Sequence, residues 1–377
     1  MGPAKAGPIF YLKIANLMFL TAYNLPHYLM SRGLVSTESV VAGDFALAET
    51  GRRNRNFKIM RRSRPGLFVK QIKTAEAQAI STIDREAAFY RVVHSDPKYA
   101  AIRNLIPRFV DFDPTRHALT LSLTENAESM AEHHARGSIY PEDTARQIGT
   151  ALGLVHWYGP RMLADPATRS LFPCQIPWPL TLDQTGYSFL DGFGAVGAEL
   201  SKAIQQRPTL QPKLSALRPY WQYDSLIHGD MKWDNCLVSR RTGDELEVSI
   251  VDWELADIGD GAWDVATIFK EYLVATIVRA GAQPPSPPGP TIETLRPSMR
   301  AFWDAYATAR RIPAEHRQGF LSRAICFTAG RMVIAALEYV VDAAYFNAWG
   351  PTMLETSVYL LDAPQVAAAQ MLGVPVG

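Results

Sequence analysis

The sequence predicts an α+β protein with two lobes, a small β-rich N-terminal lobe followed by a larger, mainly helical C-terminal lobe. Short runs in which apolar and polar residues alternate, separated by turn residues, recur between residues 44 and 123. Beyond that point, long segments carry the apolar spacing that is typical of helices. We therefore expect one domain at 1–125, which includes an N-terminal helical extension, and a second at 126–377.

The composition is that of an ordinary globular protein. Hydrophobic residues make up 47% of the 377 residues and charged residues 20%, and the net charge is +1. Nothing in this balance indicates a nucleic-acid partner. Three cysteines, Cys174, Cys236 and Cys326, are too few for a disulfide framework or a zinc site, which favours a cytoplasmic location.

The N-terminal stretch Ile9–Met30 is apolar but does not predict a membrane span or a signal peptide. Polar residues and a proline interrupt it, and it lacks a basic start and a small-residue cleavage site. We expect one or two helices packed on the outside of the first lobe, and no membrane partner.

Five strands and one helix are expected in the first lobe. The strands are predicted at Asp44–Thr50, Asn56–Arg62, Leu67–Lys73, Ile106–Asp111 and Ala118–Leu123, with the helix at Ala75–Val93. In the second lobe, helices are expected at Pro141–Tyr158, Trp263–Arg279 and most of Thr294–Leu372, and a stiff surface loop at Gln283–Pro290.

The stretch 226–264 carries the chemistry. Four residues separate Asp230 from Asn235, and Asp252 ends a later apolar run. Phosphoryl transfer needs a carboxylate that orients the attacking hydroxyl and accepts its proton, and oxygen ligands that hold Mg²⁺ on the nucleotide phosphates. The spacing H-x-D-x-x-x-x-N is that of the kinase catalytic loop, with Gly229 where protein kinases carry arginine.

These residues receive specific roles. We expect Asp230 to be the catalytic base, and Asn235 and Asp252 to be Mg²⁺ ligands, because this ion prefers hard oxygen ligands. For Glu254, two roles are equally expected: a further contact to the metal, or that of an ordinary acidic side chain. Lys232 lies two residues after Asp230, where it can neutralise the transferring phosphate; an exposed loop lysine is the alternative.

The first lobe offers candidates for binding ATP. Lys70, on the third predicted strand, is expected to contact the α- and β-phosphates and to pair with Glu86 on the following helix. An edge-strand lysine and a solvated glutamate are the alternative. The first loop lacks a G-x-G-x-x-G pattern, so Asn54 or Asn56 is a candidate phosphate donor, with a polar hairpin turn as the alternative.

Two further features of the first lobe concern binding. The segment Leu123–Asn126 falls at the expected lobe boundary, and its backbone, including that of Glu125, is expected to hydrogen-bond the adenine. Basic residues concentrate in and after the first loop and are expected either to attract an anion or to form a solvated surface. They are Arg52, Arg53, Arg55, Lys58, Arg61, Arg62 and Arg64.

With these residues aligned, the chain resembles the aminoglycoside phosphotransferase and choline kinase-like family, which is itself similar to protein kinases. The segments FVKQ, DREAAFY, ALGLVHW, HGDMKWDN and VDWELADIGDGAWDVA carry the resemblance. It implies a bilobal protein kinase-like fold. It also implies the roles given above for Lys70, Glu86, Asp230, Asn235 and Asp252.

Two departures bear on the acceptor. Met231–Asp234 places a lysine as Ser/Thr protein kinases do, and residues 126–224 hold nine acidic against eight basic residues, too few carboxylates for a polycationic aminoglycoside. A narrower resemblance is to kinase subunits of class V lanthipeptide and thioamitide biosynthesis. It implies that the enzyme phosphorylates Ser/Thr of a precursor peptide, and that a separate lyase then eliminates the phosphate.

Three functions therefore compete. The favoured function is that of a precursor-peptide kinase with a lyase partner, and the second is that of a kinase for a small hydroxyl-bearing molecule such as a sugar, an amino alcohol or an antibiotic. The third is a pseudokinase that binds a partner without transferring phosphate. The intact set of Lys70, Asp230, Asn235 and Asp252 argues against the third.

Overall fold

The structure is a computed structural model, and it describes residues 18–51, 54–137, 139–240, 246–280, 289–338 and 343–374. The chain divides into two compact units. The first comprises Met1–Tyr90 and Arg108–Glu125, and the second comprises Arg91–Pro107 and Asn126–Gly377. Residues 91–107, which we expected in the first lobe, group with the second unit.

A five-stranded antiparallel sheet forms the first unit, in the order β1-β2-β3-β5-β4. Its strands are β1 (Ala46–Glu49), β2 (Arg55–Met60), β3 (Leu67–Gln71), β4 (Phe109–Asp113) and β5 (Ala118–Ser122). Three helices accompany it: α1 (Leu25–Ser31), α2 (Thr37–Val41) and α3 (Ala77–Ser95), whose last residues count with the second unit. Each strand overlaps the segment expected from the sequence.

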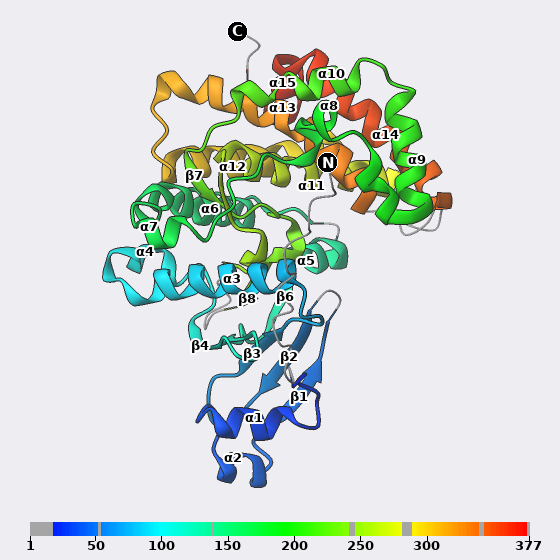
Figure 1. Ribbon diagram of the computed structural model, residues 1–377. Helices are drawn as coiled ribbons and strands as arrows, with labels where there is room; N and C mark the ends of the chain where they lie inside the picture. The colour runs from blue at the N-terminus through cyan, green and yellow to red at the C-terminus, as the bar shows by residue number, and fades with distance from the viewer. Residues whose placement is uncertain are drawn as a thin grey trace, which may run out of the picture. The chain divides into compact units, whose positions relative to one another are not determined.

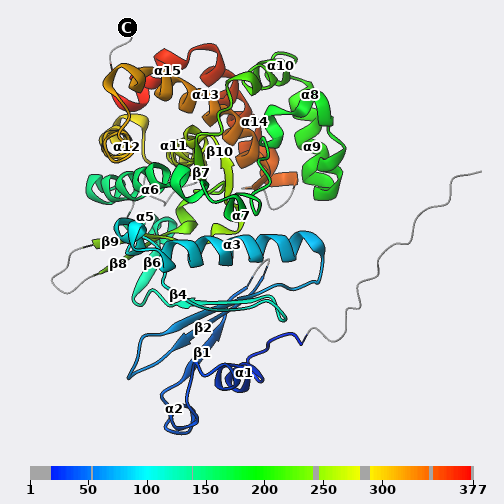
Figure 2. The ribbon, with the colours of Figure 1, turned by 60° about the vertical axis from the view of Figure 1, so that its left-hand side comes forward.

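The two faces of this sheet have different partners, because alternate residues of a strand point to opposite sides. Phe57 and Val69 pack with Leu25 and Leu29 of α1 in one buried apolar cluster. Lys70, the neighbour of Val69, belongs to the other face, where it pairs with Glu86 of α3. Figure 2 shows α1 and α3 on opposite sides of the sheet. Helix α1 therefore covers one face, and the other is left for the candidate nucleotide-binding lysine.

The second unit is mainly helical (Figure 1). Its α-helices are α4 (Ala100–Arg103), α5 (Met130–Gly137), α6 (Glu142–Met162), α7 (Pro166–Arg169), α8 (Leu182–Thr185), α9 (Gly194–Gln205), α10 (Leu210–Ser215), α11 (Gly261–Ala280), α12 (Ile292–Ala309), α13 (Ala314–Glu338), α14 (Ala343–Asp362) and α15 (Pro364–Leu372). Its 3₁₀ turns are η1 (Pro97–Tyr99), η2 (Trp178–Leu180), η3 (Ser188–Phe193), η4 (Arg218–Tyr220), η5 (Trp233–Asn235) and η6 (Trp253–Leu255).

Five short strands lie among these helices, and our sequence analysis did not predict them as strands. They form two small sheets, β10-β7 and β6-β8-β9. Their bounds are β6 (Ala127–Ser129), β7 (Ser225–Ile227), β8 (Cys236–Arg240), β9 (Leu246–Ile250) and β10 (Asp257–Gly259). Strand β7 precedes the candidate catalytic loop and strand β8 follows it.

The fold class is confirmed: a β-sheet region comes first and a helical region follows. The predicted helices correspond to α3, α6, α11 and the α12–α15 group. The expected loop at Gln283–Pro290 and the start of the Ile9–Met30 segment lie largely outside the described residues. Helix α13 is long and apolar enough to cross a membrane, but 78% of its most apolar window is buried, as in the core helix of a globular protein.

Candidate active site

The candidate catalytic loop begins at the end of β7 and is anchored on Asp264 of α11. The backbone N–H groups of His228 and Gly229 donate to the two carboxylate oxygens of Asp264, at 2.6 Å and 3.0 Å. Gly229 has a φ of 80°, and a Cβ there would lie 2.5 Å from the Leu255 carbonyl oxygen. A larger residue would therefore be both strained and obstructed, which explains the departure from the arginine of protein kinases.

A second set of hydrogen bonds joins this loop to the segment that carries Asp252. The His228 side chain accepts from the Asp230 N–H through Nδ1, so its Nε2 donates to the Val251 carbonyl at 2.9 Å. The Val251 N–H in turn donates to the Asn235 carbonyl at 2.9 Å. The loop of Asp230 and Asn235 and the segment that carries Asp252, which comes later in the sequence, therefore belong to one hydrogen-bonded assembly.

Asp230 stands between two cations. One carboxylate oxygen lies 2.7 Å from Lys232 Nζ, and the other lies 3.4 Å from a terminal nitrogen of Arg331 on α13. Burial would raise the pKa of Asp230, but the Arg331 and Lys232 charges outweigh it and lower the pKa to about 2. The carboxylate is therefore ionised and can accept a hydrogen bond from a hydroxyl.

The side-chain amide of Asn235 turns its nitrogen toward Asp230. Its side-chain nitrogen donates to the Asp230 carbonyl at 2.8 Å and lies 3.4 Å from the Asp230 carboxylate. Because the amide nitrogen is directed at these oxygens, the amide oxygen is available to accept or coordinate other partners. An amide oxygen in this position suits a hard divalent cation.

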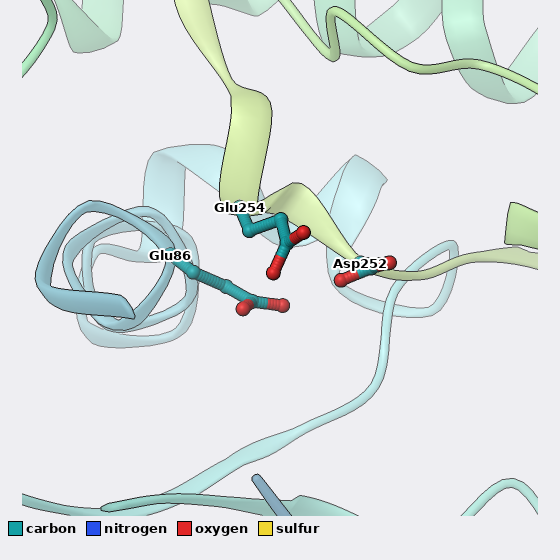
Figure 3. Close-up of side chains that lie close together, drawn as sticks. All are labelled: Glu86, Asp252 and Glu254. Atoms are coloured by element: carbon teal, nitrogen blue, oxygen red, sulfur yellow. The ribbon is translucent and has the colours of Figure 1, made fainter. Parts of the chain in front are cut away.

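Asp252 and Glu254 supply carboxylates from one tight turn at the start of η6 (Figure 3). An oxygen of each lies within 4.8 Å of the other, a separation that one ion can bridge. With the Asn235 amide oxygen they form a set of hard oxygen donors, so the residues present fit a divalent cation such as Mg²⁺. Glu86, also drawn in Figure 3, belongs to α3 and to the first unit.

In the first unit, Lys70 and Glu86 form a buried ion pair with an N–O distance of 2.8 Å. Asn56 lies directly opposite Lys70 in the register of β2 and β3, so both side chains are on one face of the sheet. Glu86 is the helix glutamate that the sequence analysis named as the partner of Lys70. The contacts of these groups with a nucleotide remain a proposal.

The remaining candidate residues described in the first unit are Asn54 and Glu125. Asn54 is buried at the start of the β2 region. The Glu125 carboxylate accepts from the Gly66 N–H at 2.7 Å and so closes the turn between β2 and β3. The proposed adenine contact concerns its backbone and is independent of this bond.

The basic run is not a single solvated surface. Arg55 donates to the Leu20 carbonyl and lies over the Phe19 ring, and Arg61 donates to the Leu34 carbonyl. Both arginines hold the N-terminal segment of the chain. Of the run, Lys58, Arg62 and Arg64 are exposed, and Arg52 and Arg53 lie outside the described residues.

Sequence analysis missed Arg331. It lies in the longest apolar run of the second lobe, and its side chain is only 4% exposed. A single arginine inside such a run was a usable signal, because buried arginines nearly always have an acidic partner. The identity of that partner could not be read from sequence, because Asp230 is 101 residues away.

The fold and this site are those of a phosphotransferase that acts on hydroxyl groups, and comparison with known proteins gives the family. Residues 44–283 match the model of the phosphotransferase enzyme family APH. The chain belongs to this family. No curated protein sequence matches it significantly.

The search of solved structures also finds three similar proteins. An ethanolamine kinase from Plasmodium vivax is 14% identical, with a TM-score of 0.57, over 92% of this chain and 89% of that one. A choline/ethanolamine kinase family protein from Mesorhizobium loti is 17% identical, with a TM-score of 0.49, over 91% and 98%. Aminoglycoside 2'-phosphotransferase-IIIa is 15% identical, with a TM-score of 0.46, over 91% and 99%.

These comparisons confirm the family resemblance and the enzyme class predicted from sequence. The ethanolamine kinase, at this level of identity, bears on the fold alone. A Ser/Thr residue of a precursor peptide as acceptor, and a separate lyase as partner, receive no support from them.

Proposed function

We propose that this protein transfers the γ-phosphate of ATP to a hydroxyl group of a small molecule, with a divalent cation, Mg²⁺, in the site. The main support is the arrangement of Asp230 and Asn235 on one loop, hydrogen-bonded to the segment that carries Asp252. Family membership supports the small hydroxyl-bearing acceptor. This choice replaces the peptide acceptor that the sequence analysis favoured.

In this mechanism Asp230 accepts a hydrogen bond from the acceptor hydroxyl and orients its oxygen toward the phosphate. A carboxylate with a pKa of about 2 is a weak base. Its contribution is therefore mainly orientation, as expected for a loose phosphoryl-transfer transition state in which the hydroxyl proton leaves late.

The cation is proposed to be held by the Asn235 amide oxygen and by Asp252, with Glu254 as a further ligand. When bound, it neutralises charge on the phosphate oxygens. Lys232 is proposed to add positive charge at the transferring phosphate. In the first unit, Lys70, oriented by Glu86, is proposed to contact the α- and β-phosphates, with Asn54, Asn56 and the Glu125 backbone as further nucleotide contacts.

The charge balance of residues 126–224, the first part of the second unit after Glu125, bears on the class of acceptor. Residues 126–224 contain nine acidic and eight basic residues, so they supply no surplus of carboxylates for a polycation. Sugars and amino alcohols with at most one positive charge fit this balance better than aminoglycosides. Ethanolamine, named for the Plasmodium vivax enzyme, belongs to the set to be tested.

The proposal is tested by incubating the protein with ATP and Mg²⁺ and an acceptor panel, read by mass spectrometry. The panel contains amino alcohols, sugars, an aminoglycoside and a Ser/Thr-containing peptide. We expect one phosphate to be added to a small acceptor, and the Asp230→Asn variant to be about 10²- to 10⁴-fold slower. Phosphate on the peptide alone, or full activity in Asp230→Asn, would refute the proposal.

A further inference from the structure

The two oxygens of the Asp230 carboxylate have different cationic partners. Lys232 Nζ is 2.7 Å from one oxygen, and the Arg331 guanidinium is 3.4 Å from the other. The Asn235 side-chain nitrogen also lies 3.4 Å from the carboxylate, and the Asp230 backbone N–H donates to His228 Nδ1. A single carboxylate is therefore held by two full positive charges that come from separate elements.

The two cations differ in how firmly they are held. Lys232 belongs to the loop before η5, and its side chain is 34% exposed. Arg331 belongs to α13, its side chain is 4% exposed, and its guanidinium lies 5.5 Å from the centre of the Trp263 ring. A long lysine side chain on a loop can change partners, whereas a packed guanidinium on a buried helix has little freedom.

We propose that Arg331 is the permanent counter-ion and positioning residue of Asp230, and that it thereby frees Lys232 to move to the transferring phosphate. This inference rests on the proposed function and adds a residue to its mechanism. Arg331 acts through Asp230 and has no proposed contact with the substrate. One ion pair in this way joins the proposed catalytic carboxylate to a buried residue of α13.

The physical reason is the cost of an unpaired charge. The Asp230 side chain is only 14% exposed, so the loss of its sole cation would leave it poorly solvated. If Lys232 were that sole cation, its movement to a phosphate would be opposed by this penalty. A second, fixed cation removes the penalty and keeps the carboxylate oriented throughout.

The test compares substitutions of two arginines on the same helix. Arg331→Met removes the charge and keeps an apolar side chain against Trp263, and Arg331→Lys keeps the charge. Arg323→Met is the matched control, because Arg323 also lies on α13, pairs with a buried carboxylate, Asp260, at 2.7 Å, and covers the ring of Phe320. The readout is kcat and KM for ATP.

We expect Arg331→Met to lower kcat by about 10- to 100-fold with a KM for ATP within about threefold of wild type, because only orientation is lost. Arg331→Lys should retain more activity than Arg331→Met, and Arg323→Met should keep a near-normal kcat. A kcat for Arg331→Met within about twofold of that of Arg323→Met would overturn the inference.

A double-mutant cycle separates positioning from a general structural effect. If Arg331 acts through Asp230, adding Arg331→Met to Asp230→Asn should change the residual rate by less than about threefold. A loss as large as that seen in the wild-type background would refute the role. Slow ATP hydrolysis, with water as the acceptor, provides a rate that needs no identified acceptor.

This design keeps the two proposals distinguishable. Failure of the proposed function would appear as wild-type protein without any turnover of ATP, or as Asp230→Asn with wild-type activity. Failure of the inference would appear as an active wild type whose rate depends on Asp230 but not on Arg331.

Discussion

Asp252 has a backbone conformation that few residues other than glycine adopt. Its φ of 67° and ψ of 57° lie in the left-handed region, where asparagine and aspartate are tolerated best. This conformation turns the chain sharply after β9 and brings Glu254 onto the same turn. At this position the requirements of the backbone and those of the proposed metal site select the same kind of residue.

Two substitutions separate these requirements. The free energy of unfolding of Asp252→Asn should lie within about 0.5 kcal/mol of that of wild type. That of Asp252→Ala should be lower by about 1–2 kcal/mol, because alanine is strained in the left-handed region. Asp252→Asn removes the negative charge of a proposed metal ligand and Asp252→Ala removes the ligand itself, so both should lower Mg²⁺-dependent phosphotransfer by about 100-fold or more. Urea unfolding and initial rates at varied Mg²⁺ measure these effects; equal stability of the two variants would contradict the strain argument.

At the scale of elements, two glycines of α6 allow this helix to pack closely against α12. A Cβ at Gly149 would lie 2.3 Å from the Phe302 carbonyl oxygen of α12, and one at Gly153 would lie 2.7 Å from the Tyr306 carbonyl oxygen. The missing side chains therefore set the distance between the two helices. This contact matters for the site, because α6 also carries His156, which hydrogen-bonds the loop anchor Asp264.

Gly149→Ala should therefore destabilise the protein, by about 1–3 kcal/mol, since backbone atoms cannot move aside as a side chain would. The control is Gly319→Ala, at an exposed position of α13 where a Cβ meets nothing within 4 Å. There the change should stabilise the helix by about 0.5–1 kcal/mol. Urea unfolding measures the free energy of unfolding of both variants. A change of the same sign in both would contradict the proposed clash between a Cβ at Gly149 and the backbone of α12.

At the scale of the whole molecule, one buried polar contact joins three helices of the second unit. His156 of α6 lies 2.9 Å from the Tyr306 hydroxyl of α12 and 3.1 Å from the Asp264 carboxylate of α11. Asp264 also holds the backbone of the catalytic loop. The packing of the helical core is thereby coupled to the position of the candidate active site.

This contact predicts a pH dependence of stability. Burial lowers the pKa of His156, and although Asp264 opposes the shift, the native chain binds a proton more weakly than the unfolded chain, which titrates near pH ~6.5. Unfolding therefore takes up a proton below that pH. The free energy of unfolding should fall by up to about 1.4 kcal/mol per pH unit as the pH drops from about 6.5.

The lowered pKa of Asp264 affects stability in a different pH range. Its contribution to the free energy of unfolding is lost only as the pH falls below the pKa of the unfolded chain, ~3.9. Urea unfolding between pH 5 and 7.5 measures the His156 effect. The His156→Asn variant should show a smaller slope in this interval. Parallel curves for wild type and variant would rule out His156 as the source.

The sequence alone predicted the elements that are long or strongly patterned. The five strands of the first sheet and the helices α3, α6 and α11 follow from alternation and from helical spacing, which are local properties of the chain. The kinase-like loop was equally readable, because Asp230 and Asn235 are separated by a fixed interval on one short segment. Family membership and the phosphotransferase class followed from these motifs.

The tertiary structure decided the contacts between residues far apart in the chain. Sequence suggested Lys70 with Glu86, but it could not place Arg331 on Asp230 or His156 on Asp264, which are 101 and 108 residues apart. Nor could it separate Arg55 and Arg61, which hold the N-terminal segment, from their exposed neighbours. The spacing of residues in the sequence determines on which face of a helix or strand a side chain lies. Which charged group it then contacts depends on how the elements pack against one another.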